Sequence, residues 1–474
     1  MKSLDILRVL AHTTWGADRK QLLRLHKALI LPKLSYGCEL YTSASRYRLK
    51  TLNAVHHSGV RLATGAFRSS PIESMLVDAG EVSLELHFET MIARCWMRFR
   101  RLPNSLASIE IRNENFFAFY RDHPNLPKPF SFRAKEILER MNLLNCKVSP
   151  HKFSPIAPWR LPEVKICKFL SKGKKTMSDD ILRTLFIEHL ANHKNTVAVY
   201  TDGSKTEAGV GYGAIFPDKE CSGTLCRMSS IFTAELNAIL TVLKDILTRN
   251  VSNYTIFSDS LSSLQSINRF NSKHPLVLEI VEWIFLLNRR GINVSFCWVP
   301  SHIGVIGNEK ADTLAKNMAE IASRSITPLP CRDIFPYIRK YIRETWQIAW
   351  ESLIDSNKKL LEITKSAYPW KYDSMPRRWE TALCRLRIGH TRLTHGFLMA
   401  NGPQPFCEDC LVPVTVKHLL VECPSLGELR RRYLSDSVGD DRNYEISKIL
   451  GKDVTFKASG VFNFIEEAGL LKEL

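Results

Sequence analysis

Four acidic residues in the middle of the chain stand where strands or helices are expected to begin or end. Asp202 and Asp259 each end a short apolar run that is typical of a buried β-strand. Glu235 stands at the start of an apolar helical stripe that begins near Thr233, and Asp312 lies in the first turn of a later helix. Carboxylates brought together repel one another and raise one another's pKa values, so such a cluster requires cations.

The ligand types predict which cations these are. Oxygen ligands with no nearby cysteine and a single loop histidine, His302, favour Mg²⁺ or Mn²⁺ over zinc. Two such ions roughly 4 Å apart form a clamp for in-line attack of water on a phosphodiester. The acids therefore predict a site for two divalent ions and phosphodiester chemistry.

The elements that must position these acids alternate between strand and helix patterns. We expect an α/β fold with a five-stranded mixed sheet and helices on its faces. The expected strands end at Asp202 or cover 209–216, 220–228, 254–258 and 293–299, and the expected helices cover 233–248 and a segment that begins near Asn308, as N-cap.

Residues from Asn195 to about Ser323 resemble a type 1 ribonuclease H domain. The matching pieces, in order, are YTDGS at 200–204, TAEL at 233–236, SDS at 258–260, WVPSHIG at 298–304 and GNEKAD at 307–312. Each piece is short, but the ordered set is specific. The resemblance implies endonucleolytic hydrolysis of the RNA strand of an RNA–DNA hybrid, which leaves 5′-phosphate and 3′-hydroxyl ends.

The same resemblance implies a role for each matching residue. His302, on a mobile loop, would assist water activation or product release, and Asn308 and Ser204 would contact the substrate, with Asn308 positioning the RNA strand. The implied metal ligands are Asp202, Glu235, Asp259 and Asp312.

Composition favours a polyanionic partner. The chain has 474 residues, a formal charge of +18 and a pI near 9.4, although its central site is acidic. The excess Lys and Arg must therefore lie elsewhere, and nucleic acid is the natural partner. No apolar run reaches the length of a membrane span, and the charged N-terminus does not resemble a signal peptide. We expect no membrane association and an intracellular location, either nuclear or cytoplasmic.

A second chemical cluster lies near the C-terminus. Its members, Cys407, Cys410, His418 and Cys423, have the spacing C-x2-C-x7-H-x4-C. Three thiolates and an imidazole can close a tetrahedral structural zinc site, so the spacing predicts a small zinc-knuckle-like module. The other cysteines are scattered, which fits a reducing compartment better than a disulfide framework.

The pattern of residues 1–105 predicts helices. Helices are expected from an N-cap at Asp18 to a point before Pro32, and over 46–67 and 83–101. Residues 1–105 resemble the segment after the palm in reverse transcriptases of Jockey-like non-LTR retrotransposons, on WGADR at 15–19, YGC at 36–38 and GAFRSSP at 65–71. The Cys-Cys-His-Cys cluster resembles the C-terminal element of the same class.

The sequence departs from that class in one important respect. A polymerase needs paired aspartates on a hairpin, but Asp179-Asp180 opens a helix-like stretch and Asp440-Asp441 has no flanking strands. We expect the polymerase palm to be missing, so the chain would not copy nucleic acid by itself. A separate reverse transcriptase is a possible partner.

These observations divide the chain into four parts. We expect a thumb- or connection-like helical module at 1–105, a linker with short helices at 106–194, the ribonuclease H domain at 195–325, and a helical segment with the zinc module at 326–474. The first functional hypothesis is a hybrid-specific ribonuclease. The alternative is a catalytically silent nucleic-acid-binding remnant of a truncated mobile element. A transposase fits poorly, because its acids usually run Asp, Asp, Glu.

Overall fold

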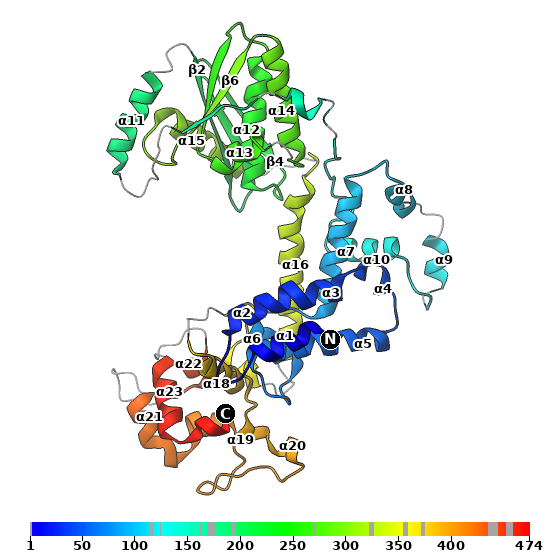
Figure 1. Cartoon of the computed structure of the whole chain (residues 1–474), viewed down its shortest axis with the longest axis vertical. Helices are drawn as coiled ribbons and strands as arrows, with labels where there is room; N and C mark the ends of the chain where they lie inside the picture. The colour runs from blue at the N-terminus through cyan, green and yellow to red at the C-terminus, as the bar shows by residue number, and fades with distance from the viewer. Residues whose placement is uncertain are drawn as a thin grey trace. The chain divides into compact units, whose positions relative to one another are not determined.

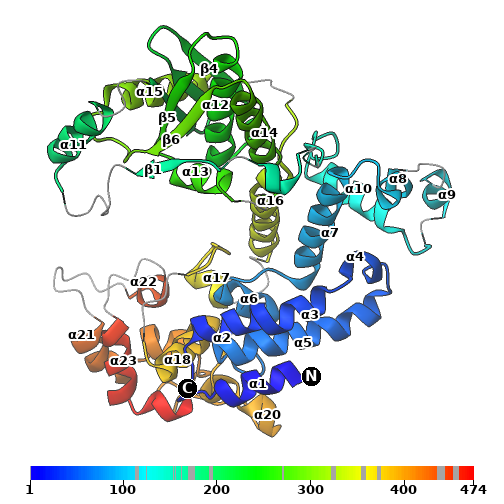
Figure 2. The same ribbon diagram turned by 45° about the horizontal axis from the view of Figure 1, so that its top comes forward.

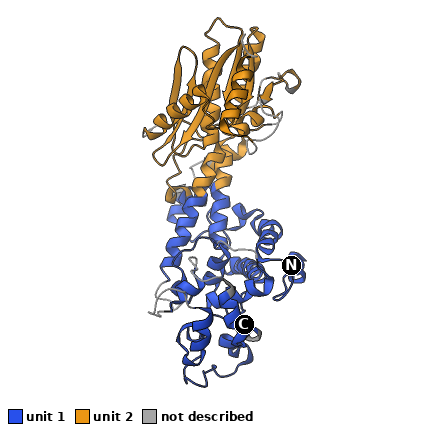
Figure 3. Ribbon diagram, turned by 90° about the vertical axis from the view of Figure 1, so that its left-hand side faces the viewer, with its two compact units in different colours: residues 1–93, 116–137, 339–474 blue, residues 94–115, 138–338 orange. Residues whose placement is uncertain are grey.

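The computed structural model divides the chain into two compact units, which are coloured separately in Figure 3. Unit 1 contains residues 1–93, 116–137 and 339–474, and unit 2 contains residues 94–115 and 138–338. The structure describes residues 2–112, 117–123, 125–152, 154, 156–161, 163–168, 177–191, 196–269, 272–321, 327–353, 359–370, 375–434, 444–451 and 458–474.

Unit 2 is built around a mixed sheet of six strands, in the order β1-β6-β5-β2-β3-β4. The strands β1, β6, β5 and β2 are mutually parallel, whereas β3 and β4 pair antiparallel to their neighbours. The strand bounds are β1 Ile166–Lys168, β2 Val197–Lys205, β3 Val210–Ile215, β4 Glu220–Leu225, β5 Asn253–Ser258 and β6 Asn293–Trp298. The mixed α/β fold is confirmed, but the expected number of five strands is wrong.

The additional strand, β1, comes from the segment that the sequence presents as a linker. Ile166 and Cys167 of β1 pair with Phe296 and Cys297 of β6, so β1 covers what would otherwise be an open edge. Figure 2 labels β1 beside β5 and β6. Three residues among several prolines are too few to show a strand pattern in the sequence.

The strand that carries Asp202 also continues further than expected. Its parallel pairing with β5 ends at Thr201 and Ser258, but its antiparallel pairing with β3 continues to Lys205 and Val210. Asp202 therefore lies inside β2, at the point where its β5 neighbour stops.

Helices cover both faces of the sheet (Figure 1). Apolar residues of α12 and α14 pack on one face in a core that includes Val199, Ile256 and Phe296. On the other face α11 packs against Phe257 and Cys297, and α15 packs against β2 and β3. The helices of unit 2 are α8 Leu106–Arg112, α11 Asp179–Ala191, α12 Ile231–Ile246, α13 Leu261–Ile267, α14 Pro275–Arg289 and α15 Ile306–Glu320, with a short 3₁₀ turn, η2, at Pro158–Arg160.

Helix α15 begins earlier than the sequence indicates. Its N-cap is Val305, so Asn308 lies in the first turn rather than at the cap, and Asp312 lies one turn later than expected. Asn308 is 3% exposed, and its side chain hydrogen-bonds with Asp259. This tertiary contact occupies the side chain that would otherwise cap the helix.

Three long helices have residues in both units: α7 Leu84–Arg100, α10 Phe130–Arg140 and α16 Cys331–Glu351. The remaining helices belong to unit 1: α1 Lys2–Leu10, α2 Arg19–Leu25, η1 His26–Ile30, α3 Leu31–Ser35, α4 Cys38–Tyr41, α5 Arg46–Thr64, α6 Ile72–Ala79, α9 Phe117–Asp122, α17 Lys359–Ile363, α18 Arg377–Ile388, α19 Arg392–His395, α20 Phe397–Ala400, η4 His418–Glu422, η5 Pro424–Leu426, α21 Gly427–Tyr433, α22 Ile446–Leu450, α23 Ala458–Glu467 and η6 Leu470–Glu473.

The two ends of the chain share one core in unit 1. Val60 and Met75 belong to the same buried cluster as Trp350 and Phe464. The buried guanidinium of Arg377 donates hydrogen bonds to the backbone oxygens of Ala63, at 2.7 Å, and Leu62, at 2.9 Å. The C-terminal segment therefore folds against the N-terminal helices.

The helix that begins after Asp18 does not stop before Pro32. The Asp18 carboxylate accepts from the Gln21 backbone N–H at 2.8 Å, which confirms the N-cap. A π-helical stretch then joins α2 to α3, and the Leu31 N–H bonds to the His26 carbonyl. This change of hydrogen-bond register places Pro32 in the first turn of α3, where its missing N–H is tolerated. Of the two aspartate pairs, Asp179-Asp180 opens α11, and Asp440-Asp441 lies outside the described residues.

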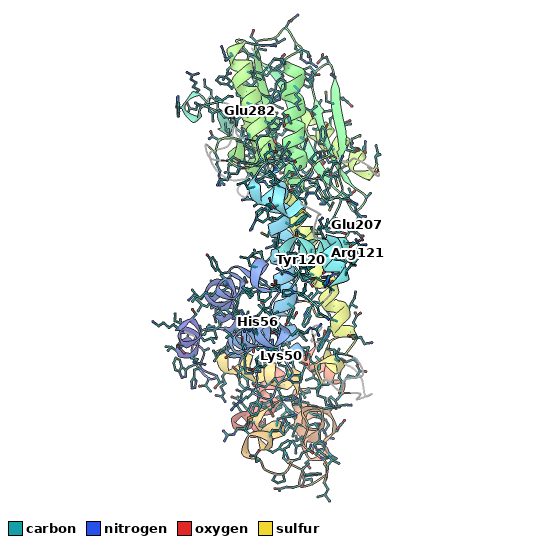
Figure 4. All side chains as sticks on the ribbon, turned by 90° about the vertical axis from the view of Figure 1, so that its right-hand side faces the viewer. Lys50, His56, Tyr120, Arg121, Glu207 and Glu282 are labelled. Carbon is teal, nitrogen blue, oxygen red and sulfur yellow. The ribbon has the colours of Figure 1, made fainter. Side chains whose placement is uncertain are left out.

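Two buried histidines are expected to make unit 1 sensitive to acid. His26 Nε2 lies 3.2 Å from Nδ1 of His56, which is labelled in Figure 4. Burial lowers the pKa of His26 to about 4 and the pKa of His56 to about 3. Both folded-state values lie below that of an unfolded histidine, so the unfolded chain binds protons first and stability falls as pH drops below about 6.5.

We expect the free energy of unfolding to fall on acidification to pH 5 by on the order of 2 kcal/mol for each of these histidines. Denaturant titrations of the full chain at pH 7 and pH 5 measure this loss. The matched control is His123→Gln, an exposed histidine, which should leave the acid sensitivity unchanged, whereas His56→Gln should reduce it. Equal acid sensitivity in both variants would contradict the assignment.

Candidate active site

Three of the four predicted acids converge where β5 ends beside β2. One carboxylate oxygen each from Asp202, Glu235 and Asp259 lies within 4.8 Å of the others. Asp202 is 6% exposed and Glu235 is 4% exposed, so two of the three groups are shielded from water. Oxygen Oε2 of Glu235 is buried and has no hydrogen-bond partner within the described part of the chain.

Small residues bring the supporting elements close enough for this convergence. A Cβ added at Gly203 would lie 2.5 Å from the backbone nitrogen of Glu235, so only glycine lets β2 approach the first turn of α12. Ser230 caps α12, accepting from the Thr233 backbone N–H at 3.2 Å, and thereby fixes where that turn begins. These contacts place Glu235 beside Asp202.

A second close approach brings α15 to the sheet. A Cβ at Gly213, the β3 partner of Asp202, would lie 2.8 Å from the backbone oxygen of Ala311. Ala311 is fully buried and directly precedes Asp312 in the sequence. The glycine in β3 therefore lets α15 deliver the fourth carboxylate to the site.

Asp312 belongs to a more exposed group at the rim. Its Oδ2 accepts from Lys316 Nζ at 2.6 Å and lies 4.0 Å from His302 Nδ1. His302 also lies 3.9 Å from Glu309, and its side chain is 65% exposed. The backbone of His302 has φ 56°, an uncommon conformation for a residue other than glycine, in the turn that precedes α15. Glu309 and Lys316 were not singled out from the sequence, although their positions three residues before and four after Asp312 on a helix predict contact.

The electrostatics of the site oppose full ionisation. Burial and the charge of Asp259 raise the pKa of Asp202 to about 7. Burial, Asp202 and Asp259 together raise the pKa of Glu235 well above its ordinary value. Burial and the Asp312 charge also raise the pKa of Asp259. Asp312 thus acts on the other acids through its charge even though its closest contacts are at the rim.

This combination fits divalent metal ions. The possible ligands are carboxylate oxygens, and one of them, Glu235 Oε2, is buried without a hydrogen-bond partner among the described residues. Because the carboxylates are crowded, their ionised forms are unfavourable unless cations neutralise them. Mg²⁺ and Mn²⁺ prefer such oxygen ligands. The residues present therefore fit the metals expected from the sequence.

The two expected substrate contacts differ in their exposure. Ser204 is half-buried on β2, opposite Gly211 of β3 and two residues after Asp202. Asn308 is buried against Asp259, and its Oδ1 has no hydrogen-bond partner among the described residues. Asn308 therefore lies where it can orient the Asp259 carboxylate, in addition to its expected contact with RNA.

The C-terminal cysteines and histidine also come together. The four predicted ligand atoms of Cys407, Cys410, His418 and Cys423 lie within 4.8 Å of one another. Cys423 Sγ is 3.9 Å from Sγ of Cys407 and from Sγ of Cys410. A tight turn builds the loop, because the Leu411 N–H bonds to the Cys407 carbonyl at 2.9 Å and Leu411 has φ 55°.

This cluster fits a soft metal ion. His418 is 4% exposed, and its Nε2 is buried without a hydrogen-bond partner within the described residues. The two sulfur–sulfur distances are 3.9 Å. Two sulfur ligands of a tetrahedral zinc ion lie close to this far apart when the Zn–S distance is about 2.3 Å, so these distances suit zinc coordination.

Comparison with known families assigns the central domain. Residues 194–320 match the family model described as RNase H, in agreement with the resemblance seen in the sequence. These residues therefore form an RNase H domain, a domain whose family binds nucleic acid, cleaves the RNA of RNA–DNA hybrids and typically uses Mg²⁺ or Mn²⁺. A search among curated proteins finds no significant match. Within the described residues, no helix combines the length and apolar character needed to cross a membrane.

Proposed function

We propose that the chain is a ribonuclease that cuts the RNA strand of RNA–DNA hybrids endonucleolytically by a two-metal-ion mechanism. The observation that carries this proposal is the convergence of Asp202, Glu235 and Asp259 within 4.8 Å, with Asp312 beside them on α15. The family match at residues 194–320 supports the same activity.

The four carboxylates would hold two Mg²⁺ ions, which supply the positive charge that stabilises the attacking and leaving oxygens of an in-line displacement. The chain's own residues prepare the site for this charge. Asp202 and Glu235 keep their oxygens away from water, and Asn308 fixes the orientation of Asp259 through its hydrogen bond. Ser204 is positioned to contact the substrate strand beside Asp202.

His302 and Lys316, at the rim of the site, would transfer protons and balance the charge of Asp312, respectively. His302 is exposed, and its Nδ1 lies 4.0 Å from Asp312, so it can carry a proton between solvent and the site during water activation or product release. Lys316 holds Asp312 in an ion pair at 2.6 Å. An incoming metal ion would compete with this ammonium group for the carboxylate.

We further propose that the chain derives from the C-terminal part of a Jockey-like retrotransposon reverse transcriptase. The supports are the sequence resemblances at residues 1–105 and at the Cys-Cys-His-Cys cluster, together with the RNase H domain between them. The boundaries at 105, 194 and 325 are part of this proposal. A separate reverse transcriptase would supply the hybrid substrate.

One assay tests the enzymatic proposal against a silent nucleic-acid-binding remnant. Purified chain is incubated with end-labelled RNA–DNA hybrid, duplex DNA and duplex RNA, with and without Mg²⁺. We expect Mg²⁺-dependent cleavage of the hybrid RNA alone, because the 2′-hydroxyl and the mixed duplex are recognised together. Binding to the hybrid without metal-dependent cutting would favour the remnant.

We propose a structural zinc ion at Cys407, Cys410, His418 and Cys423, held in a zinc-knuckle-like module. Replacing Cys410 by Ser removes one of four ligands, so the zinc content of the purified full chain should fall by about one ion. Elemental analysis after gel filtration measures the change. The control is Cys95→Ser, a half-buried cysteine outside the cluster, which should leave the zinc content unchanged. Unchanged zinc in the Cys410 variant would contradict the site.

A further inference from the structure

A third cluster of potential metal ligands lies on unit 2, outside the acidic site. It joins Cys167 of β1, His189 of α11 and Cys297 of β6, and the three ligand atoms lie within 4.8 Å of one another. Cys297 belongs to the domain matched by the RNase H family model, whereas Cys167 and His189 precede its first matched residue. The cluster thus connects the family domain to a segment added before it.

Backbone pairing fixes the two cysteines side by side. Cys167 and Cys297 are direct partners in the parallel register of β1 and β6. His189 Nε2 lies 3.5 Å from Cys297 Sγ and 4.0 Å from Cys167 Sγ. Two thiols and one imidazole nitrogen therefore surround a common point, and each belongs to a different element.

The distances suit a tetrahedral ion. With Zn–S near 2.3 Å and Zn–N near 2.0 Å, tetrahedral angles place sulfur and nitrogen ligands about 3.5 Å apart. The two observed sulfur–nitrogen distances lie at this value and 0.5 Å above it. Thiolate and imidazole together select zinc over Mg²⁺, so this cluster and the acidic site prefer different metals.

We propose that Cys167, His189 and Cys297 bind a zinc ion that fastens β1 and α11 to the RNase H sheet. Binding would release both thiol protons to solvent. The thiols also lie near backbone carbonyls, with Cys167 Sγ 3.2 Å from the Phe296 oxygen and Cys297 Sγ 3.8 Å from the Trp298 oxygen. Zinc would replace these weak contacts.

The position of the cluster gives the ion a structural consequence. Leu182 and Phe186 of α11 pack in one apolar group with Ile303 and Val305, which flank Gly304 in the loop after His302. A Cβ added at Gly304 would lie 3.6 Å from the Arg183 side chain. An ion that ties His189 to β6 would hold α11 against this loop. The proposal does not depend on the proposed nuclease activity.

The test counts zinc in a background that removes the C-terminal cluster. In full-length chain with Cys407→Ser and Cys410→Ser, we expect about one zinc ion per chain to remain. Adding His189→Ala, at a half-buried residue of α11, should remove that ion, and adding Cys297→Ser should do the same. The matched control is Cys221→Ser on β4 at the opposite sheet edge, which should retain it.

Cobalt(II) provides a spectroscopic readout that a folding defect alone would not reproduce. The double variant reconstituted with Co²⁺ should show thiolate charge-transfer absorption, which His189→Ala should abolish while the circular dichroism stays unchanged. A zinc-free double variant would overturn the proposal, and so would zinc and cobalt signals that survive His189→Ala. In either case Cys167, His189 and Cys297 would be interpreted as a group of side chains that hydrogen-bond to one another without binding a metal ion.

Discussion

Replacing Asp259 by Asn should reduce cleavage of a labelled RNA–DNA hybrid by at least about a thousandfold in Mg²⁺, or about 4 kcal/mol of transition-state stabilisation. Asn has nearly the same shape as Asp but lacks the negative charge, so the fold is kept while one metal ligand is weakened. Asp259 is a half-buried group whose pKa is raised by burial and by Asp312, which shows that it shares the field of the other acids. Initial rates at several Mg²⁺ concentrations measure the effect.

The matched control for this prediction is Asp218→Asn. Asp218 is an exposed aspartate that pairs with Arg249 at 2.8 Å, away from the acidic site. A surface ion pair contributes little to stability, so this variant should cleave at the wild-type rate. Cleavage by the Asp259 variant at the same rate would remove the site assignment.

Mg²⁺ should stabilise the chain much more at pH 8 than at pH 6. The pKa of Asp202 is raised to about 7, above the ordinary value of 3.8. In this range the folded state binds a proton more tightly than the unfolded state, so without metal the contribution of Asp202 to stability is present at low pH and is lost as pH rises through about 7. Mg²⁺ binds the ionised group, so below pH 7 each unit of acidification should weaken its apparent affinity about tenfold for each competing proton.

Thermal melting with and without Mg²⁺ measures this linkage. At a concentration 100 times the dissociation constant, the ion should add about 2.7 kcal/mol of stability. Glu235→Gln should raise the melting temperature of the metal-free chain at pH 8, because it removes a buried carboxyl group whose ionisation is costly beside Asp202 and Asp259, and it should weaken the Mg²⁺ effect. Glu207→Gln is the control, since Glu207 is an exposed residue, labelled in Figure 4, in the turn after β2. Equal Mg²⁺ stabilisation at both pH values would contradict the raised pKa.

These acids could be predicted from the sequence because each lies next to a strong local pattern. Asp259 follows five buried residues of β5, and Glu235 lies near the start of an amphipathic helix whose apolar stripe is intact. Such periodicity reports which face is buried, and hence which side chains point to the sheet. The positions of these residues could therefore be predicted before their distances were known.

Features that depend on long-range contacts could not be predicted in this way. Strand β1 has three residues and exists only because β6 offers an open edge. The shift of Asn308 from cap to first turn follows from its contact with Asp259, about 50 residues earlier in the chain. Tertiary pairing overrides local propensity in both cases.

The third cluster shows the same limit for metal ligands. The C-terminal cluster has a spacing that local chain geometry can close, so it is visible as a motif. Cys167, His189 and Cys297 span 130 residues, and only the β1–β6 register and the docking of α11 bring them together. No spacing rule signals a site of that kind.

Diffraction from crystals soaked in Mn²⁺, collected for anomalous scattering, tests the central claim most directly. We expect two anomalous peaks about 4 Å apart, bounded by Asp202, Glu235, Asp259 and Asp312 and absent from crystals of the Asp259→Asn variant or strongly reduced in them. Crystals of the wild-type chain with no peak among these four carboxylates at millimolar Mn²⁺, or with peaks only at other surface acids, would contradict the account.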